Sequence, residues 1–228
     1  MPIGYEINEL QKEESWRMFR IIGELVEGFD ELAGIEPAVS IYGSARVKEG
    51  DSLYAQTMEI ARLLGDKGFS IVTGGGPGVM EAANRGALEA GTKSIGLNIE
   101  LPEEQCGNPY TTKSITFHHF FVRKVMLVKY ASAFVVIPGG LGTLDEVTEV
   151  LTLMQTQKIK PFPVVLFKAD YWNGLLEWLR NSTMARGYIS EDDFDLLRVC
   201  DSPGEVANAV WTWYDRQELI GRKALAAV

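Results

Sequence analysis

The sequence is poor in the residues that build disulfide frameworks and metal sites. It has only two cysteines, Cys106 and Cys200, which lie far apart and form no C-x-x-C pattern. We therefore expect neither a disulfide scaffold nor a zinc site. The two histidines, His118 and His119, are adjacent, and adjacent side chains point in different directions on either a strand or a helix. Such a pair is badly placed to share a metal ion, so we expect no metal centre.

Long apolar runs and an excess of basic residues are also missing. No apolar stretch approaches the roughly 20 residues needed to cross a bilayer, and residues 1–16 are too polar for a signal peptide, so we expect a cytoplasmic protein without membrane contact. The 22 Lys and Arg against 31 Asp and Glu give a formal net charge of -9. This balance speaks against a nucleic-acid polymer as partner, because such binding needs a basic stripe. A small phosphorylated ligand stays open, since backbone N–H groups at helix starts bind phosphate without net charge.

The apolar residues that are present indicate a folded domain with an N-terminal helix. With 228 residues, 46% of them hydrophobic, the chain can bury a substantial core. We assign residues 1–36 to a helical extension and residues 37–228 to one Rossmann-like domain. From Asn8, which with Gln11 would cap the helix, to about Ala33, apolar residues recur at steps of four and three, which predicts an amphipathic helix: Met18, Ile22, Leu25, Phe29 and Leu32.

After Pro37, short runs of β-branched and aromatic residues alternate with helical stretches. The predicted strands are 38–42, 69–72, 94–97, 114–117, 133–137, 163–167 and, more weakly, 195–200. The predicted helices are 52–66, 77–90, 120–130, 144–157, 171–180 and 205–220. Strands that are apolar on both faces and alternate with helices imply a parallel sheet covered on both sides. We expect a single doubly wound α/β domain of about seven strands with an extra N-terminal helix.

Three of these strands end in loops of small residues. The loops are 42–46 (YGSAR), 73–78 (TGGGPG) and 137–143 (IPGGLGT). In an open parallel sheet they should lie together on the ligand rim. Glycine lets the backbone approach an anion closely, so we favour a phosphate site over simple tight turns. No P-loop sequence occurs, and Val79 stands where a dinucleotide fold needs its third glycine, which leaves a mononucleotide as the simplest ligand.

One of the loops opens a longer motif. Residues 138–146, PGGLGTLDE, match the P-G-G-x-G-T-x-x-E signature of the LONELY GUY (LOG) family of cytokinin riboside 5'-monophosphate phosphoribohydrolases. Residues 74–81 (GGGPGVME) and 121–124 (FVRK) resemble the longer bacterial form of that family, often labelled "lysine decarboxylase". The resemblance covers about residues 38–180. It implies hydrolysis of a nucleoside 5'-monophosphate to free base and ribose 5-phosphate, without metal or organic cofactor, in a homodimer or larger assembly.

The resemblance also implies roles for individual residues. Glu146 and Arg123 would form the catalytic pair. The remaining substrate-binding positions would be Gly139, Gly140, Gly142 and Thr143 at the 5'-phosphate with Gly43 and Ser44 as contributors, then Lys124, Glu104, Thr152, Gly75, Gly76 and, beside the base, Met80. Lysine decarboxylation is not expected, because it usually relies on pyridoxal phosphate held by a Schiff-base lysine, and no lysine stands in an evident site for it.

These residue types suit cleavage of an N-glycosidic bond. Bond breaking builds positive charge on the ribose, which the carboxylate of Glu146 can stabilise while it orients water. Negative charge gathers on the leaving base, to which Arg123 can donate hydrogen bonds, although a guanidinium is too weak an acid for ready proton donation. The base could be protonated by water, by another carboxylate or by His118 or His119, and the sequence does not choose among them.

Each assignment has a structural alternative. Residues 143–146 also fit a capping box, in which Glu146 would only bond to the backbone amide of Thr143. Arg123 and Lys124 would then be a solvated pair on a helix.

Other features also keep two interpretations. His118 and His119 fit structural or surface roles, and Glu81 faces either the crevice or solvent. For the whole protein, the alternative is a non-catalytic carrier of a nucleotide or of a phosphorylated cofactor such as the molybdenum cofactor. A carrier would not need both Arg123 and Glu146. The base preference, between cytokinin nucleotides and AMP-like or pyrimidine nucleotides, stays open.

Overall fold

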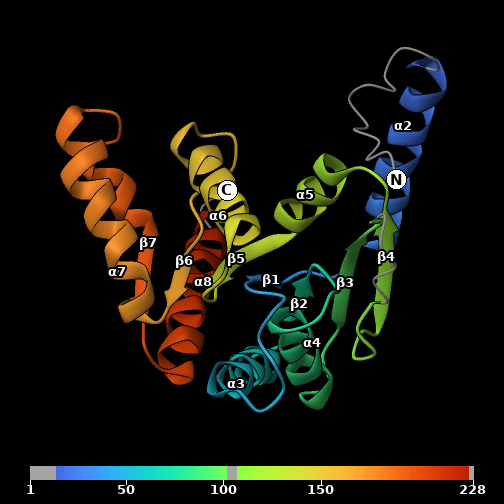
Figure 1. The fold of residues 1–228 in the computed structure, drawn as a ribbon, viewed down its shortest axis with the longest axis horizontal. Helices are drawn as coiled ribbons and strands as arrows, with labels where there is room; N and C mark the ends of the chain where they lie inside the picture. Colours follow the sequence, from blue (N-terminus) through green and yellow to red (C-terminus); the bar gives the residue numbers. More distant parts are fainter. Residues whose placement is uncertain (1–13, 102–106, 226–228) are drawn as a thin grey trace, which may run out of the picture.

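The computed structural model describes residues 14–101 and 107–225. Within them, seven parallel strands form one sheet in the order β4-β3-β2-β1-β5-β6-β7 (Figure 1). Their bounds are β1 Ala38–Tyr42, β2 Ser70–Thr73, β3 Ser94–Ile99, β4 Lys113–Phe117, β5 Ala131–Val136, β6 Val164–Phe167 and β7 Leu197–Cys200. The predicted parallel sheet is therefore confirmed.

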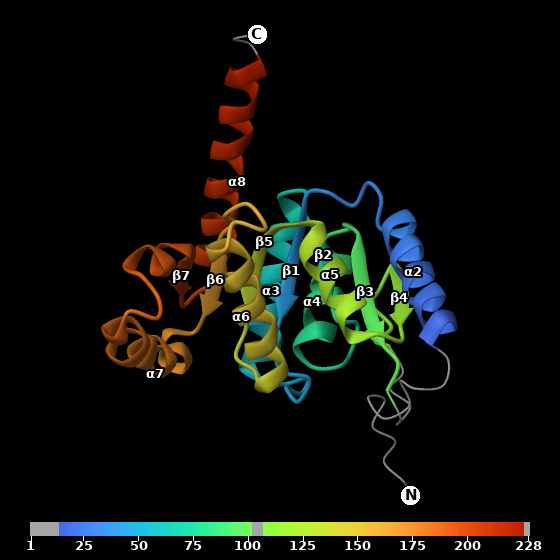
Figure 2. The same ribbon diagram turned by 90° about the horizontal axis from the view of Figure 1, so that it is seen from above.

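Seven α-helices of the described chain surround the sheet. They are α2 Glu14–Glu31, α3 Ser52–Asp66, α4 Val79–Glu89, α5 Phe120–Lys129, α6 Leu141–Gln155, α7 Ala169–Trp178 and α8 Pro203–Leu225. Beyond the sheet, α8 extends away from the domain (Figure 2). Short 3-10 and π turns connect α7 to β7: Leu179–Thr183, Met184–Arg186 and Glu191–Leu196. None of these helices combines the length and the apolar character that a membrane crossing requires.

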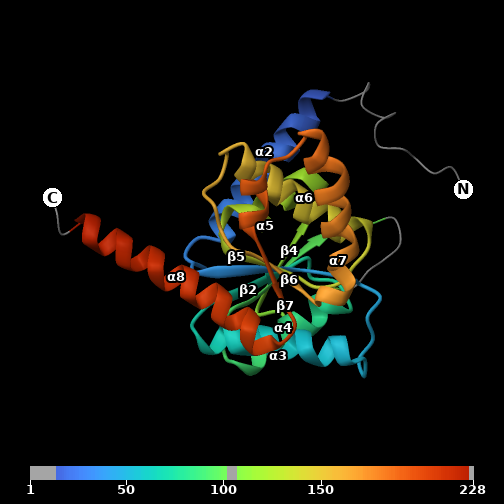
Figure 3. The same ribbon diagram turned by 90° about the vertical axis from the view of Figure 1, so that its left-hand side faces the viewer.

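The helices form two layers, each with its own hydrophobic core (Figure 3). Helices α2, α5, α6 and α7 cover one face, and α3, α4 and α8 cover the other. Side chains of β1 alternate between them: Ala38 and Tyr42 pack toward the first layer, and Val39 and Ile41 toward the second. This period of two, with all five β1 residues buried, is what a strand covered on both faces requires.

The strand order reverses beside β1. The chain runs outward from β1 through β2, β3 and β4, and β5 then returns to the other side of β1. The Ile137 N–H donates to the Tyr42 carbonyl (2.8 Å), which continues this pairing past the end of β5. The loops after β1 and β5 therefore face each other at the carboxyl ends of the strands, where open α/β sheets form their ligand crevice.

Two predicted details are wrong. Helix α6 begins at Leu141, three residues before the predicted start, because Gly140 rather than Thr143 is its N-cap. Glu146 is then too far along the helix for the proposed capping box, so that alternative falls.

The second error is the start of the last strand: β7 begins at Leu197 and not at residue 195, because Glu191–Leu196 form a 3-10 turn. The predicted apolar residues of the N-terminal helix lie in two surroundings. Leu25 and Leu32 pack on the core, as do Ile21 and the buried Glu24, whereas Met18 is 57% and Ile22 50% exposed. The predicted capping residues Asn8 and Gln11 lie outside the described residues.

Candidate active site

A cleft of about 870 Å³ opens where β1 and β5 end. Three of its borders are the glycine-containing loops after β1, β2 and β5, here called the β1 loop (residues 42–46), the β2 loop (73–78) and the β5 loop (137–143). The fourth is formed by side chains from α5, α6 and α7. The lining includes Tyr42, Ser44, Arg46, Gly74, Met80, Arg123, Gly139, Gly140, Gly142, Thr143, Glu146 and Tyr171.

Ser44 joins the three loops. Its N–H donates to the Pro138 carbonyl (3.2 Å), and its own carbonyl accepts from the Val79 N–H (3.0 Å). Gly78 has a positive φ of 71° and lies so close that a Cβ there would be 2.6 Å from the Ser44 oxygen. The predicted contributors Gly43 and Ser44 therefore line the cleft, and the rim is one hydrogen-bonded unit.

The β5 loop offers unpaired backbone donors to the cleft. The first intrahelical bond of α6 runs from the Leu144 N–H to the Gly140 carbonyl (3.0 Å). The amides of residues 141–143 precede that bond and have no acceptor within the helix, as at every helix start. A Cβ built at Gly140 or at Gly142 would meet no atom within 4 Å. Partial positive charge and open space together suit an anion at this point.

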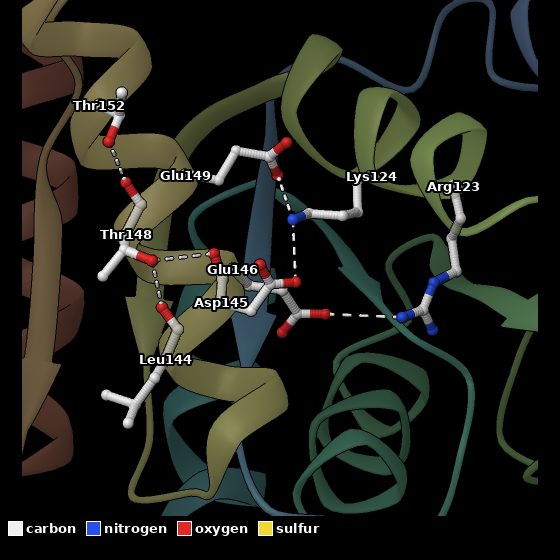
Figure 4. A network of polar contacts seen from close by, with 8 residues as sticks. All are labelled: Arg123, Lys124, Leu144, Asp145, Glu146, Thr148, Glu149 and Thr152. Carbon is white, nitrogen blue, oxygen red and sulfur yellow. Dashed lines mark hydrogen bonds and ion pairs between the residues drawn. The ribbon is translucent and has the colours of Figure 1, made fainter. Parts of the chain in front are cut away.

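Glu146 and Arg123 face each other across the cleft (Figure 4). Their side chains come from α6 and α5, are 18% and 13% exposed, and bring Oε1 of Glu146 to 3.7 Å from Nη2 of Arg123. Burial raises the pKa of Glu146 to about 7, against the lowering effect of Arg123. Burial also lowers the pKa of Arg123, which stays charged near neutrality because guanidinium is so weak an acid. Burial therefore shifts both pKa values more than the attraction between the two groups does.

Two neighbours fix the position of Arg123. Its guanidinium carbon lies 5.4 Å from the centre of the Phe120 ring, and a Cβ at Gly74 would lie 3.2 Å from Nη1. Its buried Nε has no hydrogen-bond partner among the described residues. Tyr42, at the end of β1, is buried beside Glu146, and its pKa is well above the usual value because of burial and this carboxylate. Tyr42 is thus a buried aromatic residue of the cleft lining.

Lys124 and Thr152 do not line this cleft. Lys124 Nζ lies 2.9 Å from Asp145 Oδ2 and 3.3 Å from Glu149 Oε2, which ties α5 to α6 (Figure 4). The Thr152 hydroxyl donates to the Thr148 carbonyl (2.7 Å), and the residue borders a separate apolar cavity of about 160 Å³. Neither residue is among those that line the cleft, so their predicted substrate contacts stay predictions. Glu104 lies outside the described residues.

The β2 loop is bound to the interior of the domain. Gly75 and Gly76 are buried, and their carbonyls both accept from the Asn108 side-chain amide (3.1 and 3.0 Å). Asn108 also donates to Asn84 Oδ1 (2.9 Å), which in turn accepts from the Thr73 hydroxyl (2.7 Å). Neither Gly75 nor Gly76 borders the cleft, whereas Gly74 and Met80 do. These two predicted binding residues therefore serve the loop's structure.

The histidines and Glu81 point to other partners. His118 pairs with Glu100. His119 Nδ1 lies 2.9 Å from Oε1 of the buried Glu24 of α2, and its backbone N–H donates to the same carboxylate (3.2 Å). Glu81 accepts from the Tyr54 hydroxyl (2.9 Å), and this bond contributes with burial to raise the pKa of Tyr54 to about 12. None of the three borders the cleft, which supports the structural interpretation of both histidines.

Several cleft residues were missing from the sequence assignment, among them Gly74, Tyr42, Arg46 and Tyr171. Tyr42 and Arg46 belong to the YGSAR loop. Because this loop was predicted to lie on the rim, both residues could have been predicted as part of the site. Tyr171 comes from α7, and its hydroxyl donates to the Gly139 carbonyl (2.6 Å). No local pattern marks it. In the described residues, no cluster of three or more His, Cys, Asp or Glu side chains could hold a metal ion.

The fold and the site together define a Rossmann-like α/β protein in which a helix start suited to an anion adjoins a buried carboxylate–guanidinium pair. A family model described as "Possible lysine decarboxylase" matches residues 80–210. The chain belongs to this family, the LOG family.

Relatives agree with that assignment, and a solved structure shares the fold. Cytokinin riboside 5'-monophosphate phosphoribohydrolase LOG of rice, Oryza sativa subsp. japonica, is 30% identical over 66% of this chain, and the match spans 62% of the rice protein, less than two thirds. LOG3 of Arabidopsis thaliana is 30% identical over 65% of this chain and 69% of its own. The molybdenum cofactor carrier protein of Chlamydomonas reinhardtii shares the fold, with a TM-score of 0.59 and 22% identity over 78% of this chain and 98% of its own.

Proposed function

We propose that the protein hydrolyses the N-glycosidic bond of a nucleoside 5'-monophosphate, giving free base and ribose 5-phosphate. The observation that carries this proposal is the half-buried Glu146, with a pKa of about 7, facing Arg123 in the cleft that the start of α6 also borders. The names of the rice and Arabidopsis relatives support the same reaction. A pyridoxal-dependent lysine decarboxylation has no comparable support in the cleft, because none of its lining residues is a lysine.

The reaction follows from where charge develops. The 5'-phosphate binds at the amides of residues 141–143, which places the ribose against the Glu146–Arg123 pair. As the C1'–N bond breaks, its electron pair moves to the base, and the carboxylate of Glu146 stabilises the positive ribose. Water adds its oxygen to C1' and transfers a proton to Glu146, whose pKa near 7 suits a base at neutral pH. Arg123 donates hydrogen bonds to the leaving base, which takes up one proton from the solvent, and Glu146 returns to the solvent the proton that it took from water.

The test is a panel of nucleoside 5'-monophosphates, including cytokinin and ordinary purine and pyrimidine nucleotides. Free base and ribose 5-phosphate are assayed together, with Glu149→Gln as a control variant that keeps the cleft. Release of both products in equal amounts from at least one nucleotide supports the proposal. Tight binding of a nucleotide without cleavage of any would instead support a carrier, the alternative that the molybdenum cofactor carrier fold neighbours represent.

We also propose that the protein acts as a homodimer or larger assembly. Helices α2 and α5, which pack together, present large apolar side chains to solvent. Contiguous apolar surface of this kind is typical of an association site. The residues are Trp16, Phe19, Ile22 and Val26 of α2 and Phe120, Phe121 and Val125 of α5. Light scattering at micromolar concentration should give at least twice the chain mass, and a monomer would contradict the proposal.

A further inference from the structure

Two side chains outside the glycine motif, Arg46 and Tyr171, line the same cleft as the start of α6. We propose that Arg46 binds the terminal phosphate of the substrate directly and that Tyr171 positions the β5 loop to receive it. The inference rests on the proposed function and deepens it, because it assigns recognition of the phosphate to two named side chains rather than to backbone amides alone.

Arg46 is a cation in the cleft that no acidic side chain of the described residues engages. Its backbone N–H donates to the Ser44 hydroxyl (3.1 Å), a local turn that fixes where its side chain leaves the rim. Arg85 and Arg123 each pair with a carboxylate, whereas Arg46 forms no ion pair with any described residue. In a chain of net charge -9, an unpaired guanidinium in the cleft that the start of α6 also borders is a strong local attraction for an anion. Its planar fork matches two phosphate oxygens.

Tyr171 controls which way the β5 loop presents its peptide groups. The Gly139 carbonyl accepts from the Tyr171 hydroxyl (2.6 Å), and the Pro138 carbonyl accepts from the Ser44 N–H (3.2 Å). Both loop carbonyls are thereby held by donors of the protein. Because the C=O and N–H of one peptide unit point in opposite directions, the Gly140 N–H is directed away from Tyr171.

Without that hydroxyl, the peptide between Gly139 and Gly140 would be free to turn over. Gly140 has no neighbour within 4 Å of a would-be Cβ, and glycine tolerates the positive φ that a turned peptide needs. The flip would direct the Gly139 carbonyl oxygen away from Tyr171 and remove an amide donor from the loop. Tyr171 therefore acts as a positioning residue, while Arg46 touches the ligand.

Affinity for a phosphorylated sugar tests both roles apart from catalysis. We would measure the Kd of ribose 5-phosphate by calorimetry for the full-length protein, for Arg46→Gln and for Tyr171→Phe. Matched controls are Lys48→Gln, a neighbouring cation that does not line the cleft, and Tyr188→Phe, an exposed tyrosine elsewhere. We expect roughly tenfold or greater weakening for Arg46→Gln, as for a lost charge-assisted bond, and about three- to tenfold for Tyr171→Phe. The controls should bind like the wild type.

A second readout separates these roles from a general loss of structure. With a cleaved nucleotide, Arg46→Gln should raise KM and leave kcat nearly unchanged, and neither variant should alter the affinity for the corresponding nucleoside, which lacks the phosphate. Wild-type affinity of Arg46→Gln or Tyr171→Phe for ribose 5-phosphate would overturn the role of that residue, and absence of ribose 5-phosphate binding by the wild type would overturn both. If binding depends on both residues but no nucleotide is cleaved, the phosphate site stands and the proposed hydrolysis fails.

Discussion

The β2 loop and the β5 loop have similar compositions and opposite surroundings. In the β2 loop, Asn108 occupies the carbonyls of two successive glycines, and a Cβ on Gly75 would overlap Asn98. In the β5 loop, Gly140 and Gly142 have open space around them and Leu141 is 85% exposed. Glycine therefore serves close packing at Gly75, and also at Gly139 of the β5 loop, whereas Gly140 and Gly142 leave access for a ligand. The comparison teaches that a glycine cluster indicates close approach, and that only its surroundings tell whether protein or ligand approaches.

If the β5 loop and α6 carry the catalytic site, the largest loss of catalytic rate should come from a substitution on α6. Glu146→Gln should lower kcat by about 10²- to 10³-fold, because it removes the charge that stabilises the ribose cation. The fold should persist, since the change is isosteric and leaves no capping bond broken. Steady-state kinetics and circular dichroism check both halves, beside the control Glu149→Gln. Retained turnover in Glu146→Gln would remove this residue from catalysis.

The pH profile should reveal the same carboxylate. With the pKa of Glu146 raised to about 7 by burial, its active charged form is lost as the pH falls through 7, so kcat/KM should rise from pH 6 to pH 8. Arg123 lowers this pKa, and Arg123→Gln should therefore move the half-maximal pH upward as well as reduce the rate. The substrate phosphate titrates near pH 6 in both proteins. An unshifted profile in Arg123→Gln would show that another group controls the rate.

A pair of alanine substitutions sharpens the contrast between the loops. A methyl group at Gly142 has room, and the residue lies in the first turn of α6. In Gly142→Ala the free energy of unfolding should therefore change by no more than about 1 kcal/mol. The affinity for ribose 5-phosphate should fall about tenfold or more. Gly75→Ala should do the reverse, because φ of 71° and the contact with Asn98 make any side chain strained. We expect a loss of about 1–3 kcal/mol. Equal effects of both substitutions on stability would contradict the division between the loops.

Asn84 and Asn108, which form buried hydrogen bonds around the β2 loop, offer a test of that loop with a smaller expected effect. Asn84→Ala removes the acceptor of the buried Thr73 hydroxyl and one of several partners each of Ser94 and Asn108, which should cost about 1–3 kcal/mol of unfolding free energy. The Kd of ribose 5-phosphate should change little, since the network does not touch the β5 loop. Chemical denaturation measures the first quantity and calorimetry the second. A large loss of affinity with normal stability would mean that the β2 loop also binds the ligand.

The smallest effect on stability and rate is expected from substitution of Lys124, which ties α5 to α6. Its contacts with the half-exposed Asp145 and Glu149 are of a kind that contributes at most about 1 kcal/mol. Lys124→Gln should therefore unfold almost like the wild type and change kcat by a few-fold at most. A loss of rate like that of Glu146→Gln would give Lys124 the substrate contact that its sequence position predicts.

The sequence predicted the sheet well because periodicity is local. All five residues of β1 and both ends of α3 were placed correctly, and the rim position of the β1 and β5 loops followed from topology. The start of α6 was missed because Thr143 carries a better capping side chain than Gly140, although the loop geometry places the first turn earlier. Tyr171 and Asn108 could not be found, because each meets its loop from about 30 residues away and no spacing rule relates them.

The carboxylate of Glu24 gives the N-terminal helix a share in the site. Helix α5 has no side-chain cap of its own, and its first residues instead meet Glu24 through the backbone N–H of His119. The guanidinium of Arg123 stands one turn further along the same helix. Helix α2 and the start of α5 therefore form one structural unit. We expect a chimera that exchanges residues 14–31 with those of a relative, but keeps the start of α5, to displace Arg123 although no residue of the cleft has changed.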